Sequence, residues 1–241
     1  MIVHHPNNHQ PFEDPLELLP RGLTKLYSIW VSRTYPFASI GQNVSFHFTS
    51  IISRQRASRI SIGNCVSLRK DAWLSVATED PTGEPVIVLE DNCHIGYGSI
   101  LSAKNRIHLE RDVLVGQQVI IVDHNHAYDD ITVPVVKQGI TEGGRIRIGQ
   151  GTWVGRGAAI MCPRGELNIG RGCVIAVNSV VTRSIPDYCV VFGSPATIIR
   201  QYDPQTRTWH IGSNQSRAMR NLDSRVQLSS VGLGAELVED S

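Results

Sequence analysis

An apolar residue recurs at every sixth position through the middle of this chain, in sets of three. A period of six is neither the helical repeat of about 3.6 residues nor the two-residue alternation of one long strand. It predicts short strands joined by tight corners, with the recurring side chains stacked inside a coil. Six sets keep this register: Ile40, Phe46, Ile52; Ile62, Leu68, Leu74; Leu89, Ile95, Leu101; Leu109, Val115, Ile121; Ile148, Val154, Ile160; and Ile169, Ile175, Val181.

The positions beside these apolar residues carry glycines and small side chains. Glycine often follows the recurring residue directly, as at Gly41, Gly96 and Gly155, and gives the backbone freedom at a corner. Small side chains such as Ala72 and Ser99 recur four places after it, where the corners are crowded. Three such units close one triangular turn of a solenoid, whose successive coils pair through backbone hydrogen bonds. We therefore expect an all-β fold, a parallel β-helix.

The regular spacing is interrupted between the sets. The longest interruption, residues 122–147, begins Val122-Asp123-His124-Asn125-His126 and follows the core position Ile121 directly. A loop of this length in a compact solenoid is usually functional or disordered. Its histidines come immediately after a core strand, which would hold them rigidly, as a catalytic base requires. A second long interruption spans residues 75–88.

The repeat divides the chain into three parts. Residues 1–38 form an N-terminal flank, and its apolar positions at 16–19 and 23–30 predict a helix that caps the first coil. Residues 39–200 form the β-helix. Residues 201–241 form a polar C-terminal tail, which we expect to be partly helical, over 209–222, or disordered. His4, His5 and His9 are too irregularly placed to indicate a metal site.

Composition excludes several classes of protein. Lys and Arg number 23 against 22 Asp and Glu, so no basic excess points to a nucleic-acid partner. No apolar run is long enough for a membrane span, and no basic segment followed by an apolar run marks a secretory signal. Five cysteines without a CxxC spacing argue against a disulfide framework or a zinc knuckle. We expect a reducing, cytoplasmic compartment.

The repeat resembles the hexapeptide-repeat superfamily, whose fold is a left-handed parallel β-helix, over roughly residues 38–200. Three blocks after the His-bearing loop, at 148–155, 175–186 and 193–200, narrow the resemblance to acetyl-CoA-dependent O-acetyltransferases. That group includes maltose and galactoside acetyltransferases and enzymes that acetylate surface polysaccharides, and the Asp-His-Asn-His loop is most similar to the last. The resemblance implies acetyl-CoA as donor, a sugar acceptor, no metal, and a homotrimer whose sites are shared between two prisms.

The same resemblance assigns roles in catalysis. Moving an acetyl group from a thioester to a hydroxyl requires removal of a proton from a poor nucleophile, and a neutral imidazole suits that task. His124 occupies the place of the family's general base, with His126 as the alternative. Asp123, Asp129 and Glu142 are all candidates to orient the imidazole.

Binding residues follow from the resemblance as well. In the family CoA lies in a groove between coils, where small residues allow close approach and arginines meet the phosphates. The residues that match these positions are Trp153, Gly155, Ala158, Ala176, Arg183 and Arg200. The acceptor pocket is expected between residues 75–88 and the His-bearing loop, with Asp80, Glu84, Asn105 and Asp123 as candidates to bind the sugar.

Other functions remain open at this stage. A close variant is an N-acetyltransferase that acts on an amino sugar nucleotide. Gamma-type carbonic anhydrases share the prism and bind zinc through three histidines, but their paired histidines are five residues apart, whereas His124 and His126 are two apart. A non-catalytic scaffold or sugar-binding module is a third possibility.

Overall fold

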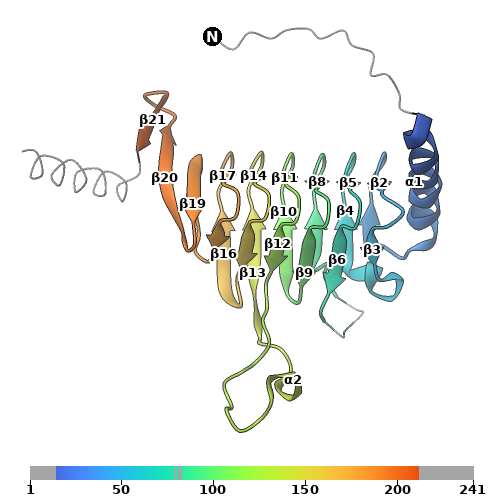
Figure 1. The fold of residues 1–241 in the computed structure, drawn as a ribbon, viewed down its shortest axis with the longest axis horizontal. Helices are drawn as coiled ribbons and strands as arrows, with labels where there is room; N and C mark the ends of the chain where they lie inside the picture. The colour runs from blue at the N-terminus through green and yellow to red at the C-terminus, as the bar shows by residue number, and fades with distance from the viewer. Residues whose placement is uncertain (1–14, 79, 81–82, 212–241) are drawn as a thin grey trace, which may run out of the picture.

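The computed structural model describes residues 15–78, 80 and 83–211 of the chain. A helix, α1 (Pro15–Thr34), stands at one end of a row of triangular coils (Figure 1). The coils form a left-handed parallel β-helix, which confirms the predicted fold class. His4, His5 and His9 lie outside the described residues.

Three sheets make the three sides of the prism. The first sheet contains β1 (Ser39–Ile40), β4 (Ile60–Ile62), β7 (Ile87–Leu89), β10 (Arg106–Leu109), β13 (Gly143–Ile148) and β16 (Arg164–Ile169). The second contains β2 (Ser45–Phe46), β5 (Ser67–Leu68), β8 (His94–Ile95), β11 (Leu114–Val115), β14 (Trp153–Val154), β17 (Val174–Ile175), β19 (Cys189–Gly193), β20 (Ala196–Asp203) and β21 (Thr208–Ile211). The third contains β3 (Ile51–Ile52), β6 (Trp73–Val76), β9 (Ile100–Ala103), β12 (Ile120–Val122), β15 (Ala159–Met161) and β18 (Val180–Val181).

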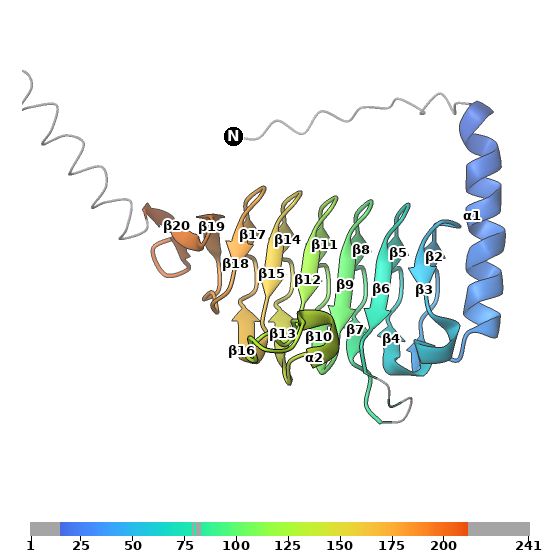
Figure 2. The ribbon, with the colours of Figure 1, turned by 60° about the horizontal axis from the view of Figure 1, so that its bottom comes forward.

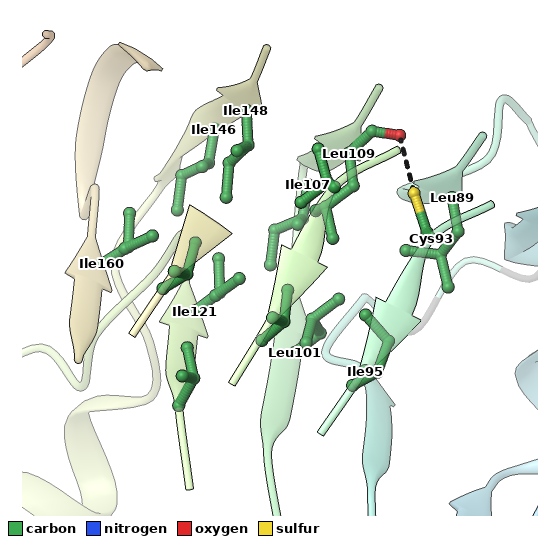
Figure 3. Packing of buried hydrophobic residues seen from close by; sticks show 14 of the residues in the cluster. Leu89, Cys93, Ile95, Leu101, Ile107, Leu109, Ile121, Ile146, Ile148 and Ile160 are labelled. Atoms are coloured by element: carbon green, nitrogen blue, oxygen red, sulfur yellow. Dashed lines mark hydrogen bonds between the residues drawn. The ribbon is translucent and has the colours of Figure 1, made fainter. Parts of the chain in front are cut away.

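The interior of the prism is a stack of aliphatic side chains. Parallel pairing places each inward residue beside its counterpart one coil away, so Leu109 lies between Leu89 and Ile148 (Figure 3). Every predicted core position is buried except Ile40, which lies in the first strand, is half-buried and packs against the core. Burial of this continuous column supplies the main stabilisation of a solenoid, because each coil covers the next.

Small and polar residues at the corners have a structural reason. At Gly96 a Cβ atom would meet the carbonyl oxygen of Gly116 in the next coil at 2.2 Å, so no larger residue fits without movement. The buried Ser99 Oγ donates to that same Gly116 oxygen at 2.8 Å and accepts from the Val119 N–H at 3.1 Å. Serine therefore satisfies backbone groups that the strand pairing leaves open at the corner.

Most of the cysteines pack as small apolar residues. Cys93, Cys162, Cys173 and Cys189 are buried, whereas Cys65 is exposed. Burial raises the pKa of the Cys93 thiol to about 12, which keeps it protonated and unreactive at neutral pH.

The two ends of the prism are covered differently. At the first coil, Ser28 of α1 accepts the Phe46 N–H at 2.8 Å, and this satisfies part of the free edge of β2. The predicted N-terminal helix is therefore present and caps the coil. At the other end, β20 and β21 add an antiparallel hairpin to β19.

The expectation of a helix from residue 209 is wrong for 209–211, which belong to β21. The edge of β20 offers backbone partners to residues 209–211, and strand pairing uses them where a helix would not. The rest of the expected helix, 212–222, lies outside the described residues. No helix in the described ranges combines the length and apolarity needed to cross a bilayer.

All the interruptions of the repeat gather along one edge of the prism, where the third sheet passes into the first. We call this the loop edge. It carries the 3₁₀ helix Arg54–Arg59, residues 77–78, 80, 83–86 and 104–105, and the long loop 123–142 with its short helix α2 (Val135–Gln138). Figures 1 and 2 show the two longest of these segments projecting from the same side. The other two edges are tight corners, so the loop edge is where the chain has room to build a site.

Candidate active site

A buried carboxylate organises the loop edge. Asp123 follows β12 directly and is fully buried. Its Oδ1 accepts the backbone N–H of Lys104 at 2.7 Å, and its Oδ2 accepts those of Asn105 and Arg106, both at 2.8 Å. One side chain thus holds the corner of the preceding coil, and the three N–H groups compensate the cost of burying its charge.

The same carboxylate holds the first histidine of the loop. His124 Nδ1 lies 2.9 Å from Asp123 Oδ1, and only 13% of the His124 side chain is exposed. An ionised carboxylate can only accept, so Nδ1–H donates and the lone pair of a neutral ring resides on Nε2. The geometry is that of an oriented general base.

This arrangement decides among the three carboxylates that the sequence left open. Asp123 contacts the imidazole, whereas Asp129 forms an ion pair with Arg164 at 3.8 Å. Glu142 contributes its backbone carbonyl to the Asn105 side chain at 2.9 Å. The expectation that Asp123 binds the acceptor sugar is wrong, because a fully buried carboxylate with four hydrogen-bond partners has no surface to offer.

The second histidine of the loop is placed differently. His126 is exposed and lies in an isolated antiparallel bridge with Ile140, where the loop folds back on itself. Among the described residues, its ring has no hydrogen-bond partner. Of the two candidates, His124 alone is held by a second side chain of the described structure.

A polar pocket of about 330 Å³ lies beside this pair. It brings together three of the predicted acceptor-binding residues, Asp80, Glu84 and Asn105, with basic residues of neighbouring coils. Lys104, Asn105 and Arg106 line it, and these are the residues whose N–H groups hold Asp123. The pocket and the Asp123–His124 pair therefore share one backbone segment.

Sequence reasoning missed Arg59, which holds the part of the pocket wall that contains Asp80 and Glu84. Its side chain is largely buried and donates to the carbonyl oxygens of Asp80 at 2.7 Å and Glu84 at 2.9 Å. Its guanidinium also lies 3.8 Å from the Asp80 carboxylate. No spacing rule marks this residue, because its partners come from a segment more than twenty positions later.

The residues predicted to bind CoA divide between two parts of the prism. Trp153 is half exposed on the outer face of the second sheet, in a row that continues through Val174 and Val190 to Arg200. That face is opposite the loop edge in a triangular section. Arg183 is exposed just after β18, on the loop-edge side, and Ala176 is half-buried at the corner after β17.

Two of these predictions fail on burial. Ala158 is fully buried inside the prism, so its side chain cannot line a surface groove. Gly155 is buried against the next coil, where a Cβ would meet the Ile175 carbonyl oxygen at 2.7 Å. The space that Gly155 leaves by lacking a side chain is therefore filled by the backbone of the next coil.

A larger hollow of about 1220 Å³ lies between α1 and the first coils. Its walls include Arg21, Lys25, Arg33, Arg69 and Lys70. It shares no lining residue with the loop-edge pocket. Neither hollow is lined by His124 or Asp123 itself, but the walls of the loop-edge pocket include the residues whose N–H groups bind Asp123, and the walls of the larger hollow do not. We place the candidate site at the loop edge, where the oriented imidazole is. In the part of the chain that the structure describes, no group of three or more His, Cys, Asp or Glu side chains is arranged to hold a metal ion.

Comparison with known proteins identifies the family of this chain. The chain is 32% identical over 150 residues to WbbJ of Escherichia coli, whose name assigns it to O-acetyl transfer in lipopolysaccharide biosynthesis. The match covers 60% of this chain and 70% of WbbJ. The chain belongs to the hexapeptide-repeat acyltransferase family. No family model matches it.

Other relatives of this chain match over shorter stretches. A protein of Mycobacterium tuberculosis named as an acetyltransferase is 36% identical over 117 residues, which are 46% of this chain and 38% of the relative. The galactoside O-acetyltransferase of Lactococcus lactis is 29% identical over 126 residues, 50% of this chain and 59% of the relative. The chain thus spans less than two thirds of either protein.

Solved structures share the fold. A variant of AntD, an N-acyltransferase from Bacillus cereus in complex with dTDP and coenzyme A, superimposes with a TM-score of 0.58 at 20% identity. That match covers 76% of this chain and 90% of AntD. AntD with dTDP and 3-hydroxybutyryl-CoA gives a TM-score of 0.57 at 19% identity, with 84% and 95% covered.

Removal of the Asp123 carboxylate tests its structural role. We expect Asp123→Ala to lower the free energy of unfolding by about 3 kcal/mol, because it leaves three part-buried backbone N–H groups without an acceptor. Asp129→Ala, at an exposed carboxylate of the same loop, is the control and should change it by less than about 0.5 kcal/mol. Urea unfolding of the two variants measures the difference, and equal losses would contradict the role given to Asp123.

Proposed function

We propose that this protein transfers an acetyl group from acetyl-CoA to a hydroxyl of a sugar in a surface polysaccharide or its precursor, with His124 as general base. The observation that carries the proposal is the buried Asp123 carboxylate bonded to His124 Nδ1 at the loop edge. The names of two relatives, which refer to O-acetyl transfer in lipopolysaccharide biosynthesis and to galactosides, support the choice of acceptor.

The chemistry follows from the free Nε2 of His124. As the acceptor oxygen attacks the thioester carbon, Nε2 takes the hydroxyl proton, and a carbon–oxygen bond forms to give a tetrahedral oxyanion. The oxyanion collapses, the carbon–sulfur bond breaks, and the imidazolium returns the proton to the departing CoA thiolate. Asp123 stabilises the imidazolium in between and holds the ring in one tautomer.

The oriented base favours a hydroxyl over an amine as the acceptor. A sugar hydroxyl is almost fully protonated at neutral pH and needs a base in the transition state. A neutral amine carries its own lone pair and depends less on one. Transfer to an amino sugar would therefore make a fixed, carboxylate-supported imidazole less necessary.

The separation of the CoA candidates from His124 suggests a shared site. Trp153 and Arg200 lie on the face opposite the loop edge, so a donor bound there in one copy would reach the His124 of another copy. We propose a homotrimer in which each site lies between two prisms, since a closed ring brings this face of each copy to the loop edge of the next. Ala176 and Arg183 remain candidates for donor contacts in that assembly.

Replacement of His124 tests the base. We expect His124→Ala to reduce kcat by roughly 10²–10⁴, as the loss of a general base does. His126→Ala is the matched control from the same loop and should stay within a few-fold of the wild type. Release of free CoA thiol with a panel of hydroxyl and amino sugars measures both variants. An unaffected His124→Ala, or a loss confined to His126→Ala, would rule out His124.

Complementation tests the shared site. A chain with His124→Ala keeps the Trp153 face, and a chain with Arg200→Glu keeps the base. If base and face come from different copies, random co-assembly of the two variants should restore about a quarter of the wild-type activity, since one interface in four combines both intact parts. Activity no higher than that of the separate variants would place both parts in one chain.

A further inference from the structure

Two arginines stand side by side in the loop-edge pocket. Arg106 of β10 pairs in register with Arg145 of β13, and both face outward from the first sheet. Both line the pocket of about 330 Å³. Like charges directly opposite each other on neighbouring strands repel, so this pair is unfavourable unless something compensates it.

Arg145 also lies in register with Glu166 of β16, on the side away from Arg106, but these two side chains form no ion pair. Neither guanidinium has a hydrogen bond or an ion pair with any residue that the structure describes. The other cations of this region are compensated: Arg59 meets Asp80, the Lys104 ammonium donates to the Thr141 carbonyl, and Arg147, the next outward residue of β13, pairs with Glu110. Arg106 and Arg145 are thus the exception in a well-paired neighbourhood.

The charge of the pocket lining also favours an anionic ligand. Its described residues include four cations, Arg59, Lys104, Arg106 and Arg145, and two carboxylates, Asp80 and Glu84. Asp80 is already near Arg59. The lining therefore carries two more cations than carboxylates. The two paired arginines present planar donors suited to a carboxylate or a phosphate.

The pocket wall is also tied to the loop that carries His124. The Arg106 N–H bonds to Asp123 at the start of that loop, and the Asn105 side chain bonds to the Glu142 carbonyl at its end. A group bound by the arginines would therefore rest on the backbone segment that fixes the base.

We propose that the acceptor carries an anionic group, a carboxylate or a phosphate, and that Arg106 and Arg145 bind it. This inference rests on the proposed function and names its substrate class: acidic saccharides rather than neutral ones. The two arginines are specificity residues, because they hold the charged group and leave the proton transfer to His124.

The test compares three matched acceptors: methyl glucoside, methyl glucuronoside and methyl glucoside 6-phosphate. Calorimetry without acetyl-CoA measures binding, and thiol release with acetyl-CoA measures transfer. We expect at least one acidic glycoside to bind more tightly than the neutral one, and Arg106→Gln and Arg145→Gln to weaken that binding by roughly 10- to 100-fold. Binding of the neutral glycoside should not change. Preference between the carboxylate and the phosphate identifies the anion.

Arg147→Gln is the matched control, because it removes an outward arginine of the same strand that lies outside the pocket. It should leave acidic binding unchanged. Equal binding of neutral and acidic glycosides, no binding of either acidic one at millimolar concentration, or equal losses in all three variants would overturn the proposal. Arginine-dependent binding without acetyl transfer to any acceptor would uphold the pocket and refute the proposed function, so the two failures are distinguishable.

Discussion

The buried carboxylate of Asp123 is the interaction on which the loop edge depends. A charge with no exposed surface costs several kcal/mol unless hydrogen bonds replace its water. Here three backbone N–H groups and one imidazole N–H supply them. A single carboxylate therefore holds the corner of one coil, the start of the long loop and the imidazole ring of His124 in place. Loss of the carboxylate would leave all of these donors without their acceptor.

The solenoid explains why the chemistry gathers there. Inside the prism, successive coils are so close that Gly96 has no room for a Cβ, and the column of aliphatic side chains fills the rest. Two edges are tight corners, so long segments can leave the coil at the third edge. Because each strand is fixed by two neighbours, residues that follow it directly, such as Asp123 and His124, are held more rigidly than a typical loop residue.

Much of this could be predicted from the sequence. The six-residue period predicted the buried column, because one side chain per strand faces inward, and the break after Ile121 predicted the position of His124. The sequence could not select Asp123 over Asp129 and Glu142 as the residue that orients the imidazole, since the partners of Asp123 at 104–106 come from the preceding coil. Ala158 was wrongly expected at a ligand groove, because a small residue has the same signature whether it fills an interior corner or borders a ligand. The strand at 209–211 was missed because it forms only by pairing with β20, which itself pairs with β19 at the end of the prism.

The central claim is that Asp123 fixes His124 as a base with a free Nε2. The tautomer of that ring, measured by ¹⁵N chemical shifts of selectively labelled histidine with His124→Ala used for assignment, tests it most directly. At a pH where the ring is neutral, we expect a proton on Nδ1 and none on Nε2, and a mixture of tautomers in Asp123→Asn. A ring protonated on Nε2 in the wild type, or one that Asp123→Asn leaves unchanged, would contradict the account.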